Sequence, residues 1–161
     1  MVRLDPMTET EFRVYLEDDI QRYAQAQVRA GNWHPTEAME KSRKEHQQLL
    51  PDGLASKNQH LFSIMDEELG CQVGVIWFAV YDEGLRPSVF IYDFLIHDDF
   101  RRRGYGTQAL EALEDKVKEL GIDRISLHVF GYNQIAQALY RKLGYEIAGM
   151  HMTKQLEPST L

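Results

Sequence analysis

Hydrophobic positions in the first third of the chain follow a helical period. Thr8 and Glu11 have the spacing of a capping box, in which two side chains close the first turn of a helix. From there, apolar side chains recur every three or four residues up to Gly31: Phe12, Leu16, Ile20, Tyr23 and Val28. The pattern predicts one helix over this segment and a second, less regular helix over residues 35–50, ended by Pro51.

The rest of the chain alternates between strand and helix patterns. Short apolar or alternating runs predict strands at residues 2–4, 61–66, 72–81, 89–96, 124–130 and 145–154. The run at 72–81 is nearly all apolar, as in a strand buried on both faces. Helical spacing predicts helices from Gly104 to Leu120 and from Asn133 to Leu143. This order indicates an α/β fold, with a mixed sheet of six or seven strands and about four helices on its two faces.

Length and composition suit a single domain over residues 1–161. The chain is 43% hydrophobic and 27% charged, which is ordinary for a globular protein, and no linker or repeat divides it. No apolar run approaches the roughly 20 residues that cross a bilayer, and the N-terminus lacks the apolar core of a secretory signal. Cys71 is the only cysteine, so we expect a reducing, cytoplasmic setting. A formal net charge of −7 disfavours a nucleic-acid partner and is compatible with a cationic substrate.

A basic turn with two glycines separates the strand at 89–96 from the helix that follows. The turn and the first helical residues are Arg101, Arg102, Arg103, Gly104, Tyr105, Gly106 and Thr107. A helix N-terminus presents unpaired N–H groups and the positive end of the helix dipole, so it binds anions. The glycines let the backbone approach a phosphate closely, the arginines add positive charge, and Thr107 adds a hydroxyl. The turn therefore predicts a phosphate site, most simply for a pyrophosphate; the alternative is a solvated basic turn.

The two glycines also fit the dinucleotide fingerprint Gly-x-Gly-x-x-Ala, which ends here at Ala109. In that motif, however, the glycines follow the strand closely and a second nucleotide-binding half comes later, whereas residues 97–103 intervene here and too little chain follows. The order Ile96, then Arg-x-x-Gly-x-Gly, instead resembles motif A of the GNAT superfamily of acetyl-CoA-dependent N-acetyltransferases. Downstream, LHVFGYNQIAQALYRKLGY resembles motif B of the same superfamily: a strand, Asn133, a helix with Tyr140, and Gly-aromatic.

The resemblance covers residues 61–156 and implies a largely antiparallel GNAT-like sheet. It implies acetyl-CoA as the acetyl donor and no metal, with the pyrophosphate on the basic turn and the pantetheine arm near Asn133. The end of the preceding strand, Leu95 and Ile96, would polarise the acetyl carbonyl, and Tyr140 would protonate the leaving thiolate. The implied activity is direct transfer of the acetyl group to a primary amine of a small molecule or peptide in a ternary complex. The resemblance implies no nucleic-acid or membrane partner and leaves a homodimer open.

The residue that takes the proton from the amine is left open by the sequence. Asp93, a carboxylate in an otherwise apolar strand, is the first candidate. Tyr92 stands where some relatives have a catalytic Glu; strict alternation places Tyr92 and Asp93 on opposite faces, and a β-bulge would change this. His128 and a water chain to solvent are the other routes. The alternative, purely structural interpretations are that Asn133 only caps a helix and that Tyr140 is a core aromatic residue.

Two other functions were considered, and the identity of the acceptor stays open. A nucleotide-binding module is disfavoured by the position of the glycines, and a catalytically silent acyl-CoA sensor would have no need of Asn133 together with Tyr140. The resemblance implies that the N-terminal helices, residues 8–50, shape the acceptor pocket, with Trp33 and His34 as candidate wall residues, together with residues 145–152. No sequence feature separates polyamine, aminoglycoside, amino acid and protein acceptors.

Overall fold

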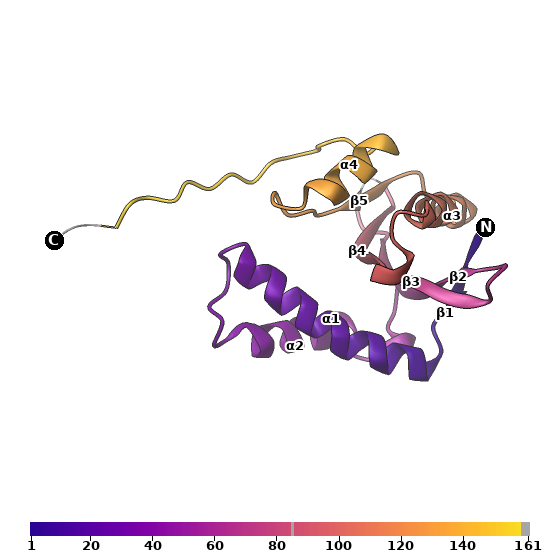
Figure 1. Cartoon of the computed structure of the whole chain (residues 1–161), viewed down its shortest axis with the longest axis horizontal. Helices are drawn as coiled ribbons and strands as arrows, with labels where there is room; N and C mark the ends of the chain where they lie inside the picture. The colour runs from indigo at the N-terminus through magenta and orange to yellow at the C-terminus, as the bar shows by residue number, and fades with distance from the viewer. Residues whose placement is uncertain (85, 159–161) are drawn as a thin grey trace.

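The computed structural model describes residues 1–84 and 86–158 of the chain (Figure 1). Its elements, in chain order, are β1 (Val2–Pro6), α1 (Glu9–Arg29), α2 (Ala38–Leu49), the 3₁₀ turn η1 (Gly53–Ala55), β2 (Gln59–Asp66), β3 (Cys71–Tyr81), β4 (Ser88–Ile96), the 3₁₀ turn η2 (Asp98–Phe100), α3 (Tyr105–Glu119), β5 (Ile125–Leu127) and α4 (Gln134–Lys142). Each helix predicted from the sequence has a counterpart, and so has each predicted strand except the last.

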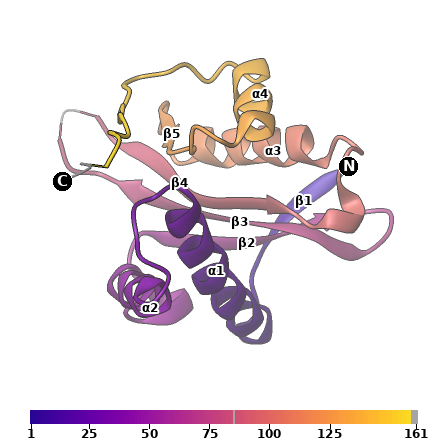
Figure 2. The same cartoon turned by 60° about the vertical axis from the view of Figure 1, so that its left-hand side comes forward.

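A single sheet with the order β1-β2-β3-β4-β5 organises the molecule. β1 to β4 pair antiparallel, whereas β5 lies parallel to β4 because α3 carries the chain back across the sheet. α1 and α2 cover one face of the sheet, and α3 and α4 cover the other (Figure 2). The predicted class, a mixed and largely antiparallel α/β fold, is confirmed; the described residues form five strands rather than six or seven.

The two faces of the sheet have separate apolar cores. On one face, Leu110, Leu113 and Val117 of α3 are fully or almost fully buried, because a spacing of three to four residues turns them all toward the sheet. On the other face, Phe12 of α1 packs with Trp77 of β3. Side chains of β3 contribute to both cores, and the central residues of this strand are buried on both faces, as its apolar run predicted.

The first helix starts as its sequence predicted. The Thr8 hydroxyl accepts a hydrogen bond from the Glu11 amide at 3.2 Å, and the Glu11 carboxylate accepts one from the Thr8 amide at 2.9 Å. This capping box satisfies two amides at the helix start and directs α1 along the face of the sheet. Of the helices in the described ranges, none has the length and apolarity to cross a membrane.

The predicted strand at residues 145–154 is wrong for this single chain, and the strand at 124–130 is shorter than predicted. β5 ends at Leu127, and the residues after Tyr145 form no ladder with any described strand. Figure 1 shows this segment as an extended trace that leads away from the body of the molecule. The alternation of apolar and polar residues is present in both segments, but a strand also needs a neighbour to accept its backbone hydrogen bonds.

Candidate active site

The candidate site is a cleft that opens where β4 and β5 part. The two strands pair only over residues 89–91 of β4, so residues 92–96 have no described strand beside them on this side. A cavity of about 950 Å³ fills the gap and reaches α1 and α2. Most of the predicted site residues line it: Asp93, Leu95, Ile96, Arg101, Arg102, Gly104, Tyr105, Gly106, Thr107, Asn133 and Tyr140. Arg103 is the exception; its guanidinium lies 5.7 Å from the centre of the Phe100 ring, and it does not line the cavity.

The turn before α3 presents backbone amides to this cleft. Gly104 is the N-cap of α3 with φ +82°, and Arg102 also has a positive φ of 64°. The first helical hydrogen bond runs from the Gln108 amide to the Gly104 carbonyl at 3.2 Å, so the amides just before Gln108 have no partner in the helix. A Cβ on Gly106 would lie 3.2 Å from the Leu139 side chain, so a larger residue at this position would require Leu139 to shift.

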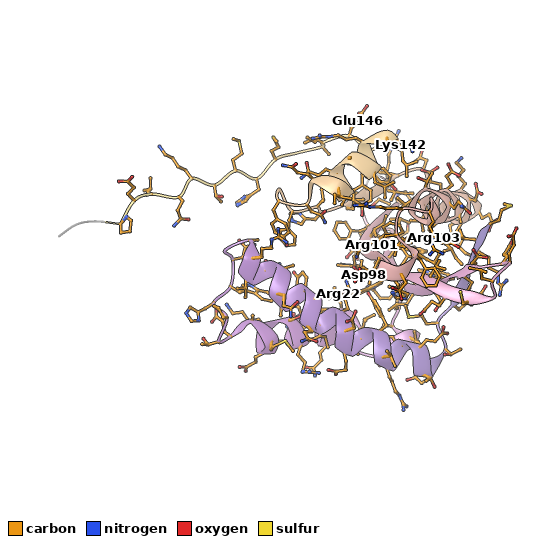
Figure 3. The ribbon with its side chains drawn as sticks, in the orientation of Figure 1. Arg22, Asp98, Arg101, Arg103, Lys142 and Glu146 are labelled. Carbon is orange, nitrogen blue, oxygen red and sulfur yellow. The ribbon has the colours of Figure 1, made fainter. Side chains whose placement is uncertain are left out.

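Some side chains of the turn stabilise its conformation, and others face the cleft. Arg101 donates from Nε to the Ile96 carbonyl at 3.1 Å and pairs with Asp98 at 3.1 Å, which ties the turn to the end of β4. The Tyr105 hydroxyl donates to the Asp66 carboxylate in the core. Figure 3 shows Arg101 and Asp98 on the turn and Arg22 on α1, the element that faces the turn across the cleft. The amides at the helix start, the Arg102 side chain and the Thr107 hydroxyl are therefore the groups of the turn that remain for an anion.

The end of β4 directs one amide toward the cleft. The His97 amide donates to the Val73 carbonyl at 2.8 Å, so it points toward β3. Because N–H groups alternate along a strand, the Ile96 amide points the other way, to the side where β4 has no partner. The Nε of Arg101 donates to the Ile96 carbonyl on that same side.

α4 supplies the other wall of the cleft, with Asn133 and Tyr140 two turns apart. The Asn133 side chain accepts a hydrogen bond from the Ala136 amide at 3.2 Å, so it does cap the helix. Burial raises the pKa of Tyr140 to about 12, and the nearby Asp93 carboxylate contributes to this rise. The phenol therefore holds its proton at neutral pH.

A β-bulge at Tyr92 decides which way Asp93 faces. Trp77 of β3 pairs with Asp93 and the next residue, Phe78, pairs with Ile91, so Tyr92 is skipped in the ladder. Tyr92 and Asp93 consequently both face α1, rather than opposite faces as strict alternation predicts. Tyr92 stacks on Trp77 with ring centres 4.8 Å apart.

Asp93 is held by two side chains of α1. The Tyr15 hydroxyl donates to its carboxylate at 2.8 Å, and Arg22 donates from Nη2 at 2.9 Å. Burial, and after it the nearby Asp19, raise the pKa of Asp93, while Arg22 and Tyr15 oppose the rise; the net result is a pKa of about 6. Its side chain is 16% exposed, so the carboxylate is still open to the cleft.

The end of the cleft beside α1 and α2 carries several charged groups. Asp19 pairs with Arg22 at 3.2 Å and accepts from His46 at 2.8 Å. Burial lowers the pKa of His46, but its hydrogen bonds to Asp19 and to the Ser42 carbonyl outweigh this effect, so the pKa is raised overall. Glu45 of α2 also lines the cavity.

Sequence analysis did not identify Tyr15, Asp19 or Arg22. Asp18, Asp19 and Arg22 have the spacing of ion pairs along one helix, a pattern typical of a solvent-facing surface, and nothing in it indicates a partner 71 residues away. The candidate wall residues 33 and 34 do not line the cavity: Trp33 packs edge-on against Tyr23, which does, and His34 contacts Thr36. The exposed His128 lines the cavity on the β5 side. Over residues 1–84 and 86–158, no group of three or more His, Cys, Asp or Glu side chains is placed to hold a metal.

Known proteins match this chain over nearly its whole length. It is 38% identical to the uncharacterized N-acetyltransferase YycN of Bacillus subtilis (strain 168) over 155 residues, which cover 96% of this chain and 99% of YycN. It is 36% identical to YdgE of the same organism, over 95% of this chain and 97% of YdgE. The crystal structure of YycN matches with a TM-score of 0.93, covering 98% of this chain and 100% of that one.

A more distant structure shares the fold alone. AAC(6')-Iy in complex with the bisubstrate analogue CoA-S-monomethyl-acetylneamine is 15% identical, with a TM-score of 0.59 over 98% of this chain and 99% of that one. Residues 18–145 match the sequence model of the Acetyltransferase (GNAT) family, whose members are acyltransferases that use acetyl-CoA. With this match and two relatives above 30% identity over nearly their full length, the chain belongs to the GNAT family of acetyltransferases.

Proposed function

We propose that this enzyme moves an acetyl group from acetyl-CoA directly to a primary amine bound in the same cleft. The observation that carries the proposal is that one cleft holds an anion-binding turn at its β4–α3 end, Tyr140 on one wall and Asp93 at its acceptor end. These are a site for a phosphate, an acid for a leaving thiolate and a base for an amine.

The acetyl donor would lie in the gap between β4 and β5. Its pyrophosphate would accept hydrogen bonds from the amides of residues 102–107, where Gly104 and Gly106 keep side chains away from the backbone. Its pantetheine arm would add to the unpaired part of β4 as an extra strand, next to Asn133. The Ile96 amide, which points away from β3, would then donate to the acetyl oxygen.

The reaction needs two proton transfers in addition to the attack. The amine nitrogen forms a bond to the acetyl carbon, the carbonyl oxygen gains negative charge, and the C–S bond then breaks to give the amide and the CoA thiolate. Asp93 takes the proton that the amine must lose, directly or through a water. Tyr140, which is protonated at neutral pH, donates its proton to the sulfur as it leaves, so that CoA departs as the thiol, and the phenolate regains a proton from solvent.

We further propose that the acceptor carries a second positive charge. We place the acceptor at the end of the cleft beside α1 and α2. Asp19, Glu45 and Asp93 give this end three carboxylates, whereas Arg22 and His46 are its two basic side chains. A cation placed there gains from the excess of negative charge in a partly desolvated site.

Thiol release from acetyl-CoA, measured across a panel of amines, tests both parts of the proposal. 1,4-Diaminobutane and 4-aminobutanol form a matched pair, because they differ in the second charge and hardly in size. We expect a higher kcat/KM for the diamine, a preference that falls in Glu45→Gln and is kept in Glu40→Gln, a control on the exposed side of the same helix. Equal rates for the two amines would contradict the cationic acceptor. Binding of acetyl-CoA without thiol release for any amine would contradict catalysis and indicate a silent acyl-CoA sensor.

A further inference from the structure

Gly74 of β3 lies where the neighbouring strand leaves no room for a side chain. A Cβ at this position would lie 2.2 Å from the Leu95 carbonyl oxygen and 3.1 Å from both Cα and Cδ1 of Ile96. Among the glycines of residues 1–84 and 86–158, it alone has a neighbour closer than 3.0 Å to this point. Its φ lies outside the left-handed region, so the position requires glycine for space and not for backbone conformation.

The oxygen that fills this space belongs to the peptide between Leu95 and Ile96. β3 runs beside β4 here and pairs Gly74 with Ile96 (Figure 2). The His97 amide donates to the Val73 carbonyl at 2.8 Å and so points toward β3; by alternation, the Leu95 carbonyl points toward β3 as well. This carbonyl therefore reaches into the volume that a Cβ of Gly74 would occupy.

The same peptide carries the Ile96 amide, which opens on the cleft. In a planar trans peptide the N–H points opposite to the C=O. With the Leu95 carbonyl against Gly74, the Ile96 N–H points away from β3, into the gap where this part of β4 has no described strand beside it. Ile96 lines the cavity that fills the gap. The space at Gly74 and the direction of the Ile96 amide are therefore coupled through one rigid peptide.

We propose that Gly74 is a positioning residue for acetyl transfer: its lack of a side chain lets the Leu95 carbonyl lean against β3, which aims the Ile96 amide at the acetyl oxygen. This role rests on the proposed function, in which the Ile96 amide stabilises the negative charge that develops on that oxygen. A methyl group at position 74 would push the carbonyl back by roughly an ångström before ordinary contact is reached. Because the peptide is rigid, its N–H would turn with the carbonyl. A donor stabilises an oxyanion only when it is aimed at the position of that oxygen.

Gly74→Ala tests the proposal, with Ile64→Val as a matched control. Ile64 is fully buried and pairs with Gly74 from the opposite side, on β2. Both variants should lower the melting temperature, because one overpacks the core and the other removes a buried methyl group. Only Gly74→Ala should lower kcat, by about 100-fold, as expected for the loss of one oxyanion donor. The Kd of CoA should stay within about threefold of wild type in both variants, because the amides of the turn before α3 would hold the pyrophosphate.

The infrared spectrum of bound acetyl-CoA, isotope-labelled at the acetyl carbonyl, reports the hydrogen bond itself. A hydrogen bond to a carbonyl oxygen weakens the C=O bond, so the band should lie at lower frequency on wild type and Ile64→Val than on Gly74→Ala. The double variant Gly74→Ala/Ile96→Ala, compared with Ile96→Ala alone, removes the contact with Cδ1 of Ile96 and keeps the contact with the Leu95 carbonyl. We therefore expect Gly74→Ala to lower kcat by the same factor in both backgrounds.

The other outcomes separate this role from the proposed function. A folded Gly74→Ala variant with the kcat and the infrared band of wild type would overturn the role and leave the proposed function standing. A loss of kcat that Ile96→Ala reverses would also overturn it, since the side chain and not the carbonyl would then be in conflict. A wild type that releases no thiol with any amine would overturn the proposed function, and this role with it. If Gly74→Ala does not fold, the NMR shift of the Ile96 amide in wild type decides: it should move more on binding acetyl-CoA than on binding CoA, and equal shifts would overturn the proposal.

Discussion

Asp93→Asn tests the proton route through a carboxylate that two side chains of α1 hold in place. The amide keeps the shape of the carboxylate and can still accept hydrogen bonds from Tyr15 and Arg22 through its oxygen, but it cannot take a proton from an amine. The variant should therefore fold, bind acetyl-CoA normally and lose most of its turnover.

The pKa of Asp93 sets the size of the expected pH effect. With a pKa of about 6, the carboxylate is about 9% ionised at pH 5 and about 91% at pH 7, so a rate that depends on it rises about tenfold between these values. With the ordinary value of 3.8, it would be almost fully ionised at both and the rate would hardly change. The interval from pH 5 to pH 7 therefore separates a perturbed base from an ordinary carboxylate.

The assay is the ratio of kcat/KM for wild type and Asp93→Asn with one good acceptor. Both enzymes use the same amine, so the ionisation of the amine cancels in the ratio. We expect the ratio to rise about tenfold from pH 5 to pH 7 and then level off. A ratio that stays flat refutes the role of Asp93 as base. His128→Gln measured in the same way then separates an imidazole base from a water chain, since only a catalytic imidazole would change the profile when it is removed.

Thermal unfolding checks the same pKa without any substrate. Asp93 has a higher pKa in the folded protein than in the unfolded chain, so folding favours its protonated form. Its stabilising contribution is complete below about pH 3.8 and is lost as the pH rises through about 6. The melting temperature of wild type should therefore fall relative to that of Asp93→Asn across this window. An unchanged difference would mean that burial does not raise the pKa of Asp93.

Three further variants, one of them with a matched control, test the rest of the site. Gly104→Ala and its control Gly121→Ala both place a Cβ at positive φ (+82° and +75°) with little around it, so each should cost about 1 kcal/mol of stability. Only Gly104→Ala should raise the Kd of CoA measured by calorimetry, by about tenfold; equal affinity in both variants would reject the turn as the phosphate site. Tyr140→Phe keeps the ring and should lower kcat roughly 100-fold at unchanged CoA affinity, whereas full turnover with a chemically limited substrate would make the phenol structural. Tyr15→Phe removes a donor to Asp93 and should move the rise in kcat/KM to higher pH; a profile that stays in place would show that this hydrogen bond does not tune the base.

The secondary structure was predictable wherever the pattern that specifies it lies within a short segment of the sequence. The capping box at Thr8 and Glu11 and the helical spacing that buries Leu113 depend on residues a few positions apart, so the sequence displays them directly. The glycine-containing turn before α3 is also local, and ten of the residues that the sequence suggested for the site, together with Asp93, line one cleft.

The features that sequence analysis predicted wrongly or left open depend on long-range pairing. The segments at 128–130 and 145–154 have strand sequences but no neighbouring strand among residues 1–84 and 86–158, and a strand cannot form alone. The bulge at Tyr92 inserts a single residue into one ladder, and nothing in the local sequence fixes where it occurs. That one residue changes the face of the sheet on which Asp93 lies.

The bulge and the side chains of α1 together give Asp93 a proton affinity that suits a base. Burial beside Asp19 without a cation would keep the carboxyl protonated and unable to accept a proton at neutral pH. Arg22 in an open, hydrated site would have the opposite effect, lowering the pKa and making the carboxylate a weak base. In this structure the two influences oppose each other, and the pKa lies at about 6, so the carboxylate is mostly ionised at neutral pH and can still accept a proton. Arg22 and Tyr15 contact Asp93 because the bulge turns its side chain toward α1. The pKa of the proposed base therefore depends on the geometry of this one β-bulge.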